Sequence, residues 1–343
     1  MKHVFGLLFL LLAAFTAGAG GHTFTVAGAQ VLLNGTPFKV IGLRLSNALI
    51  SEATTDQLIN NLDTFKDFGV NTVSVFLMGS RFGDVKGYRP DASLDPVYAV
   101  LLARIIEAAD NRGMVVLVGC LYWSTSLAKE DLAQWTQAEA NTAVANTVAW
   151  LSTNHYRNVL VDVDNEGMAH ASTKWDIGQM IDAGHAVDSR IMLAYNSKGP
   201  PPPNADLLIH HSPKDHRRPW IETEGSPYDA ARGGYWGSYS KRDKFYNYIR
   251  VGRYTPDMKA RQLRDTHAAI RQNAGYLLAS TWLQCVGGEG VGGPFMTPGG
   301  LAENRAVDEE VTKVQEDAGI RWWLEEIKKV YGAWKPPRQN RGS

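Results

Sequence analysis

Residues 158–166 read Asn-Val-Leu-Val-Asp-Val-Asp-Asn-Glu. A short run that is dense in Val and Leu and ends in a carboxylate indicates a strand of a parallel sheet covered by helices. Residues 219–225, Pro-Trp-Ile-Glu-Thr-Glu-Gly, have the same form. The fold therefore depends on how many such strands the chain contains and on what lies between them.

Eight strand-like runs follow an N-terminal hairpin. The hairpin covers residues 22–37, with strands at 23–26 and 30–33 closed by Asn34-Gly35, a common turn pair. The eight runs are residues 38–45, 71–78, 114–122, 158–164, 191–195, 206–210, 219–223 and 275–283.

Amphipathic helical patterns separate most of these runs. They cover residues 56–68, 95–111, 138–153, 175–186, 256–273 and 311–330. The links 196–205 and 211–218 are too short for a helix. We therefore expect an α/β fold, a (β/α)8 TIM barrel that lacks helices between strands five and six and between strands six and seven. A doubly wound open sheet is the alternative, although no Gly-x-Gly-x-x-Gly turn follows a first strand.

The first residues of the chain predict that the protein is exported. Lys2, an apolar run from 4 to 15 and Ala17-Gly18-Ala19 together have the form of a signal peptide, which we assign to residues 1–21. No later run reaches 18 apolar residues, so we expect a soluble, secreted barrel over 22–334 with no stable membrane insertion, followed by a polar tail, 335–343. The two cysteines, Cys120 and Cys285, are expected to be buried free thiols.

The composition narrows the classes of partner that the protein is expected to bind. Thirty-five basic residues balance 35 acidic ones, so no long-range field attracts nucleic acid, and we expect none as a partner. Ten Trp, 13 Tyr and 11 Phe indicate stacking surfaces for a neutral ligand. No motif calls for a cofactor. The oligomeric state is left open.

Two glutamates lie where a barrel carries out chemistry. Glu166 and Glu224 end the fourth and seventh strands, which open at the C-terminal face. A protonated carboxyl can donate to a leaving oxygen while an ionised one stands beside the reacting carbon. The pair therefore predicts catalysis by two carboxyl groups in different protonation states.

The chain resembles the clan A glycoside hydrolases, and family 5 in particular. The resemblance rests on Asn165-Glu166, on the run 219–224 and on Trp282 in the eighth strand, and it extends to the hairpin residues 34–38. It implies that Glu166 is the general acid/base and Glu224 the nucleophile of a retaining enzyme that acts on a poly- or oligosaccharide. It also implies that Asn165 binds the sugar 2-hydroxyl, that His210 supports the nucleophile, and that Trp282 lies under the sugar.

The chain departs from the family 5 pattern at three places. Ser74 and Phe76 stand in the second strand, where the family usually carries an Arg. Tyr122-Trp123 ends the third strand, where a His is common, and Gly167 replaces the usual Pro after Asn-Glu. We include Tyr122 and Trp123 among the substrate-binding candidates.

Several further residues are expected to support the site. By strand alternation Asp162 and Asp164 share the face of Glu166, and Arg44 is their candidate partner. Glu222 shares a face with Glu224 and is expected one layer deeper, in hydrogen bonds that hold the site. The aromatic segment 235–248, which contains Trp236, roofs the cleft or packs over the trimmed side. His211 is expected to be a solvated loop residue.

Two other functions remain as alternatives. A non-catalytic carbohydrate-binding barrel would keep the aromatic cleft without the acid chemistry. A metal-dependent barrel hydrolase would use His210, His211, Asp162 and Asp164, but adjacent histidines of a strand point to opposite faces, and we expect no metal.

Overall fold

The computed structural model describes residues 21–46, 48–78, 85–123, 128–225, 239–240, 245–246, 256–279 and 320–338. Its centre is a closed barrel of parallel strands in the order β10-β13-β4-β5-β6-β7-β8-β9. The strands are β4 (Val40–Arg44), β5 (Thr72–Phe76), β6 (Val115–Leu121), β7 (Val159–Asp164), β8 (Met192–Tyr195), β9 (Leu207–Ile209), β10 (Trp220–Gly225) and β13 (Gly275–Leu278). Each coincides with one of the expected runs, so the predicted barrel is confirmed. Cys285, Trp282 and Trp236 lie outside the described residues.

Both faces of the strands are buried, as their composition predicts. In β7, Val159, Val161 and Val163 belong to the large cluster that also contains the helices, whereas Leu160 belongs to a second cluster inside the barrel. The alternation places Asp162 and Asp164 on the inward side of the same strand.

Helices surround most of the barrel. They are α1 (Glu52–Asp67), α2 (Pro96–Asp110), α3 (Ala128–Asp131), α4 (Gln137–Thr153), α5 (Met168–Thr173), α6 (Ile177–Asp188), α8 (Pro256–Gln272) and α12 (Arg321–Tyr331). Helix α1 begins four residues before its expected start, since Ser51 and Thr54 form a capping box there. Asp95 caps α2, and Pro96 occupies its first turn as the sequence predicts.

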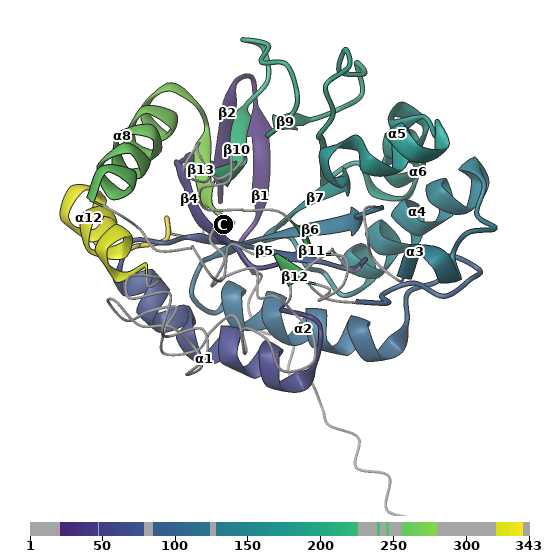
Figure 1. The fold of residues 1–343 in the computed structure, drawn as a ribbon, viewed down its shortest axis with the longest axis horizontal. Helices are drawn as coiled ribbons and strands as arrows, with labels where there is room; N and C mark the ends of the chain where they lie inside the picture. The colour runs from purple at the N-terminus through teal and green to yellow at the C-terminus, as the bar shows by residue number, and fades with distance from the viewer. Residues whose placement is uncertain are drawn as a thin grey trace, which may run out of the picture.

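Among the residues that the structure describes, no helix covers one side of the barrel. The links from β8 to β9 and from β9 to β10 contain none, and in Figure 1 the helices leave the side of β9 and β10 open. Arg218 holds these links together, because its side chain donates to Asp215 and to the carbonyls of Pro202 and Ala205. The expected trimming is confirmed.

The N-terminal segment is a three-stranded antiparallel sheet rather than a simple hairpin. Its strands are β1 (Phe24–Ala27), β2 (Gln30–Leu33) and β3 (Thr36–Pro37). The prediction that Asn34-Gly35 closes the first two strands was wrong: this pair, with φ of 53° and 75°, joins β2 to β3. Phe24 and Val31 pack in the cluster inside the barrel with Leu117. Because this sheet closes the N-terminal end, the opposite end is the open one.

Two further predictions concern the thiols and membrane-spanning segments. Cys120 is a buried free thiol, and burial raises its pKa to about 12. Among the described residues, none of the helices is long and apolar enough to cross a bilayer.

Candidate active site

Glu166 lies in a tight left-handed turn, not in the strand itself. β7 ends at Asp164, and the 3-10 turn η1 (Asn165–Gly167) leads into α5. Glu166 has φ 55° and Gly167 has φ 63°. A Cβ atom at residue 167 would lie 2.4 Å from Ser197 Oγ, so glycine fits this position for two reasons. Proline, the usual family residue, cannot adopt this φ.

Asp164 stabilises this turn. Its two carboxylate oxygens accept hydrogen bonds from the amides of Ala169 and His170, each at 2.9 Å, at the start of α5. The expected ion pair of Arg44 with Asp164 and Asp162 was therefore wrong as a direct contact. The carboxylate of Asp162 accepts a hydrogen bond from Asn196 Nδ2 at 2.9 Å, and it acts on Arg44 through charge alone. Because the strand has ended, strand alternation does not govern Glu166.

Arg44 connects Glu224 to the turn that carries Glu166. It ends β4, its side chain is 1% exposed, and it forms an ion pair with Glu224. Its Nη2 also donates to Asn165 Oδ1 at 3.1 Å. The guanidinium lies over the ring of Phe76, 4.6 Å from the centroid. The second barrel strand carries Ser74 and Phe76 where family 5 usually has an Arg. In this chain Arg44 supplies a positive charge from the first barrel strand.

Glu224 and Glu222 lie on an irregular strand. Glu222 pairs with Tyr276 and Gly225 with Leu278, so β10 has one extra residue between them relative to β13. The side chains of Glu222 and Glu224 still share a face, as the two-residue spacing predicts, because both carboxylates face the ring of His210. Glu222 also lies in hydrogen bonds, as expected, because its Oε1 accepts from His210 Nδ1 at 2.6 Å and from the Glu224 amide at 2.9 Å.

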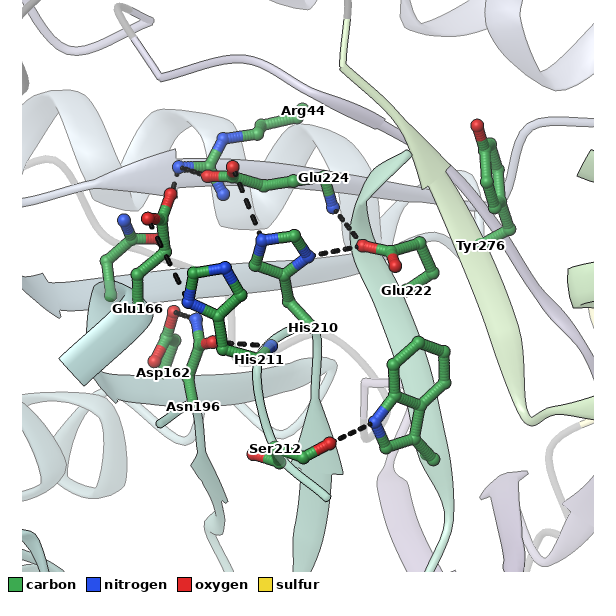
Figure 2. A network of polar contacts seen from close by, with 12 residues as sticks. Arg44, Asp162, Glu166, Asn196, His210, His211, Ser212, Glu222, Glu224 and Tyr276 are labelled. Carbon is green, nitrogen blue, oxygen red and sulfur yellow. Dashed lines mark hydrogen bonds and ion pairs between the residues drawn. The ribbon is translucent and has the colours of Figure 1, made fainter. Parts of the chain in front are cut away.

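His210 and His211 both face the site. Their rings stack with centroids 4.3 Å apart and planes 18° apart (Figure 2). The expectations that the two point to opposite faces and that His211 is solvated were wrong. β9 ends at Ile209, and His210 has φ 41°, so strand geometry no longer applies. His211 Nδ1 lies 4.0 Å from Glu166 Oε2.

The two glutamates are close enough to interact. One oxygen of each, together with one ring nitrogen of His210, lie within 4.8 Å of one another. Burial raises the pKa of Glu166 to about 7, and the charge of Glu224 adds to the shift. Since Arg44 pairs with Glu224, the site favours a protonated Glu166 beside an ionised Glu224. This is the division of roles that an acid and a nucleophile need.

The same three side chains, Glu166, Glu224 and His210, lie close enough together to be compared with a metal site. Burial opposes a charge on His210, but the hydrogen bond to Glu222 and the carboxylates around it raise its pKa to about 9. A doubly protonated imidazole has no lone pair for a metal, and Arg44 already neutralises Glu224. The proton on His210 and the ion pair of Glu224 therefore both oppose metal binding by this donor set. Asp164 cannot join it, because its oxygens bind amides.

Two buried atoms near Glu166 have hydrogen-bonding capacity to spare. Asn165 Nδ2 and His211 Nδ1 are both buried without a hydrogen-bond partner. A ligand hydroxyl would satisfy such groups. The Asn165 amide thus has a free donor, in keeping with its expected contact with a sugar.

The aromatic candidates are placed in part. Tyr122 is buried against Phe76, with ring centroids 5.4 Å apart, and the Arg44 guanidinium lies 5.6 Å from its centroid. Trp123 is partly exposed and contacts the rings of Trp175 at 5.0 Å and Trp135 at 6.4 Å. In the segment 235–248, only the backbone of the pair β11 (Tyr239–Ser240) and β12 (Phe245–Tyr246) is described.

Sequence reasoning missed two residues of the site, His211 and Asn196. Asn196 is buried directly after β8, and its Oδ1 accepts from the His211 amide at 3.3 Å while its Nδ2 donates to Asp162. A buried polar residue directly after a barrel strand is a signal that would have identified Asn196. The signal for His211 was its adjacency to His210.

Comparison with known proteins identifies the fold. No family model and no curated protein matches the sequence. Solved structures of glycoside hydrolase barrels do match. A family 5 glycoside hydrolase from Bacteroides vulgatus has a TM-score of 0.54 at 15% identity, over 81% of this chain and 68% of that one. A β-glucanase from Saccharophagus degradans in complex with cellotetraose has a TM-score of 0.53 at 11% identity, over 91% and 94%. An exo-β-1,4-mannosidase from an Opitutaceae bacterium has a TM-score of 0.51 at 15% identity, over 86% and 60%. The chain thus has the barrel fold of these solved glycoside hydrolases, which include a family 5 structure.

Proposed function

We propose that the protein is a secreted, retaining glycoside hydrolase that cleaves O-glycosidic bonds of a poly- or oligosaccharide. The observation that carries this proposal is the pairing of Glu166 and Glu224, with an oxygen of each within 4.8 Å. Retaining enzymes hold their carboxyl groups about 5–5.5 Å apart, whereas inverting enzymes leave roughly 6.5–9.5 Å for a water molecule.

In the first step, Glu224 attacks the anomeric carbon while Glu166 gives its proton to the leaving oxygen. The bond from that carbon to the leaving oxygen breaks, and a glycosyl ester forms on Glu224. The pKa of Glu166, raised to about 7 by burial and by Glu224, supports its role as the acid.

In the second step, Glu166 takes a proton from water, and the water oxygen bonds to the anomeric carbon. The ester bond to Glu224 breaks, and Glu224 regains its negative charge. Arg44 and His210 lie beside Glu224 to stabilise that charge. We expect Asn165 Nδ2 to donate to the sugar 2-hydroxyl, and its burial without a partner supports this role.

The substrates to try first are β-linked glucans and mannans, because the similar structures include a β-glucanase with cellotetraose and an exo-β-1,4-mannosidase. The purified protein is incubated with a panel of plant, algal and microbial polysaccharides, and new reducing ends are measured. The Glu166→Gln, Glu224→Gln double variant is the control. We expect turnover of at least one glycan by the unmodified protein only. Binding without turnover would contradict the proposal and favour a carbohydrate-binding barrel.

The secretion part of the proposal rests on the first residues of the sequence. Full-length protein made in a secreting host is expected to lose roughly its first 19 to 21 residues. N-terminal sequencing of the released protein tests this. An intact Met1 on membrane-bound protein would contradict it.

A further inference from the structure

The ring of His210 is held between two carboxylates of one strand. Its Nδ1 lies 2.6 Å from Glu222 Oε1, and its Nε2 lies 3.6 Å from Glu224 Oε2 (Figure 2). A carboxylate can only accept, so Nδ1 carries a hydrogen toward Glu222. The same oxygen of Glu222 accepts the backbone amide of Glu224. One carboxylate oxygen therefore fixes both the imidazole and the backbone of the proposed nucleophile.

The surroundings leave the ring little freedom. His210 has a left-handed φ of 41°, directly after β9 ends. One face of its ring stacks on His211, 4.3 Å away. The backbone and the stacking thus fix the ring plane, and the bond to Glu222 then directs Nε2 toward Glu224.

We propose that Glu222 is a positioning residue that holds His210 as an imidazolium with Nε2–H directed at Glu224, so that two cations, Arg44 and His210, flank the nucleophile. This inference rests on the proposed glycosidase function. It assigns to Glu222 an effect on rate that Glu222 exerts through His210, without contact with the sugar.

The charges around the ring favour the imidazolium. The charged or titratable groups that face it are Glu222 and Glu224 from β10, Glu166 from η1, Asp162 from β7 and His211 beside it. Arg44 from β4 is the next charge, paired with Glu224. The carboxylates outweigh the cost of burial, in keeping with a pKa of about 9 for His210. Burial and the charge on His210 lower the pKa of His211. The stacked pair therefore carries its charge on the ring next to Glu224.

An imidazolium at this place acts chiefly on the second chemical step. When the ester breaks, Glu224 leaves as a carboxylate, and a cation beside it stabilises the charge that develops. Loss of the cation is therefore expected to slow hydrolysis of the ester more than its formation.

The test replaces Glu222 by glutamine, which keeps the shape and removes the charge. On an aryl glycoside with a good leaving group, we expect Glu222→Gln to lower kcat about 10- to 100-fold, the range for a hydrogen bond to a charged group. We also expect a lower KM and a burst of aryl alcohol, because the ester accumulates. NMR of ¹⁵N-labelled imidazoles, assigned with a His210→Gln variant, should show His210 losing its proton at lower pH in Glu222→Gln than in the unmodified protein.

Asp206 offers a matched control. It accepts from His185 Nε2 at 2.9 Å and from the Leu193 amide at 2.7 Å, the same combination of imidazole and backbone amide. The control change Asp206→Asn should alter the titration of His185 and leave kcat, KM and His210 unchanged.

The outcomes separate this inference from the proposed function. Suppose that the unmodified protein turns over glycosides and that Glu222→Gln keeps the same kcat and the same His210 titration. That result would overturn the inference but leave the proposed function standing. Absence of turnover in the unmodified protein would contradict the proposed function, and the imidazole titration would still decide whether Glu222 holds the imidazolium. If Glu222→Gln does not fold, the kinetics of His210→Gln, which places an uncharged donor at residue 210, take its place. A loss of kcat with a burst would support the inference, and an unchanged kcat would overturn it.

Discussion

The Nη2 atom of Arg44 donates a hydrogen bond of 3.1 Å to Oδ1 of Asn165. The same guanidinium forms an ion pair with Glu224, so one buried side chain connects the turn that carries Glu166 to the strand that carries Glu224. The bond occupies the Asn165 oxygen and leaves its Nδ2 without a partner. Arg44 thus orients the Asn165 amide and neutralises the charge of Glu224 at the same time.

The role of Glu166 predicts a dependence on the leaving group. Glu166→Gln cannot donate a proton, and such catalysis is typically worth roughly 10²–10⁴-fold in rate. We expect a loss in that range for natural glycans and a much smaller loss for activated aryl glycosides, whose leaving groups need no proton. The measurement is kcat/KM for a series of aryl leaving groups. An equal loss across the series would show that Glu166 has another role.

The same residue predicts a change in stability with pH. The pKa of Glu166 in the folded protein is about 7, above its ordinary value of 4.5. The folded state therefore holds this proton more tightly, and the stability that Glu166 contributes below pH 4.5 is lost as the pH rises to 7.

Glu166→Gln removes this loss. From pH 4.5 to pH 8, the free energy of unfolding of the variant should gain on the order of 3 kcal/mol relative to the unmodified protein. Urea denaturation at the two pH values measures it. Glu130→Gln, at an exposed position of α3, is the control. A difference that is independent of pH would show that Glu166 is not held protonated.

Gly167 predicts a link between backbone strain and activity. Gly167→Ala requires a side chain at φ 63° and brings its Cβ within 2.4 Å of Ser197 Oγ. A displacement of about 1 Å at Glu166 can cost roughly 10²-fold in kcat. Gly28→Ala is the matched control, because Gly28 has φ 56° with nothing within 4 Å. Both variants should lose about 1–3 kcal/mol of stability or less, but only Gly167→Ala should lose activity. Normal kcat in Gly167→Ala would contradict the described turn.

We expect Trp123 to form part of a surface on which sugars stack. It follows β6, beside the strand that leads to Glu166, and the buried rings of Trp135 and Trp175 support it. Trp123→Ala should raise KM for a long glycan about 2- to 12-fold, equivalent to roughly 0.5–1.5 kcal/mol. Trp150→Ala, on α4 and packed on Tyr156, is the control and should leave KM unchanged. Equal KM values for the two variants would remove Trp123 from the binding surface.

The barrel was predictable from the sequence, because helix-covered parallel strands such as 158–164 are apolar on both faces and end in their polar residues. The positions of Glu166 and Glu224 at one end of the barrel were predictable for the same reason, because both are carboxylates at strand ends. The short links around β9 showed directly where helices are absent.

The details that were missed depend on backbone angles that sequence patterns do not contain. A left-handed φ at His210 is uncommon for a residue other than glycine, and it turns His211 into the site. The bulge in β10 likewise cannot be read from the letters Glu-Thr-Glu. The true partners of Asp164 are amides of the short helix α5. This helix has too few residues for a recognisable sequence pattern, so Arg44 was the partner that the sequence suggested.

The central claim is that Glu224 forms a covalent bond to the sugar. The direct measurement is mass spectrometry of peptides from protein trapped with a 2-fluoro glycoside of the sugar that the substrate panel identifies. NMR of the first-formed anomer in the reaction with unmodified substrate accompanies it. The account predicts one added fluoro-sugar on the peptide that contains Glu224 and a product that keeps the anomeric configuration of the substrate. An inverted first product, or a label on Glu222, would contradict it.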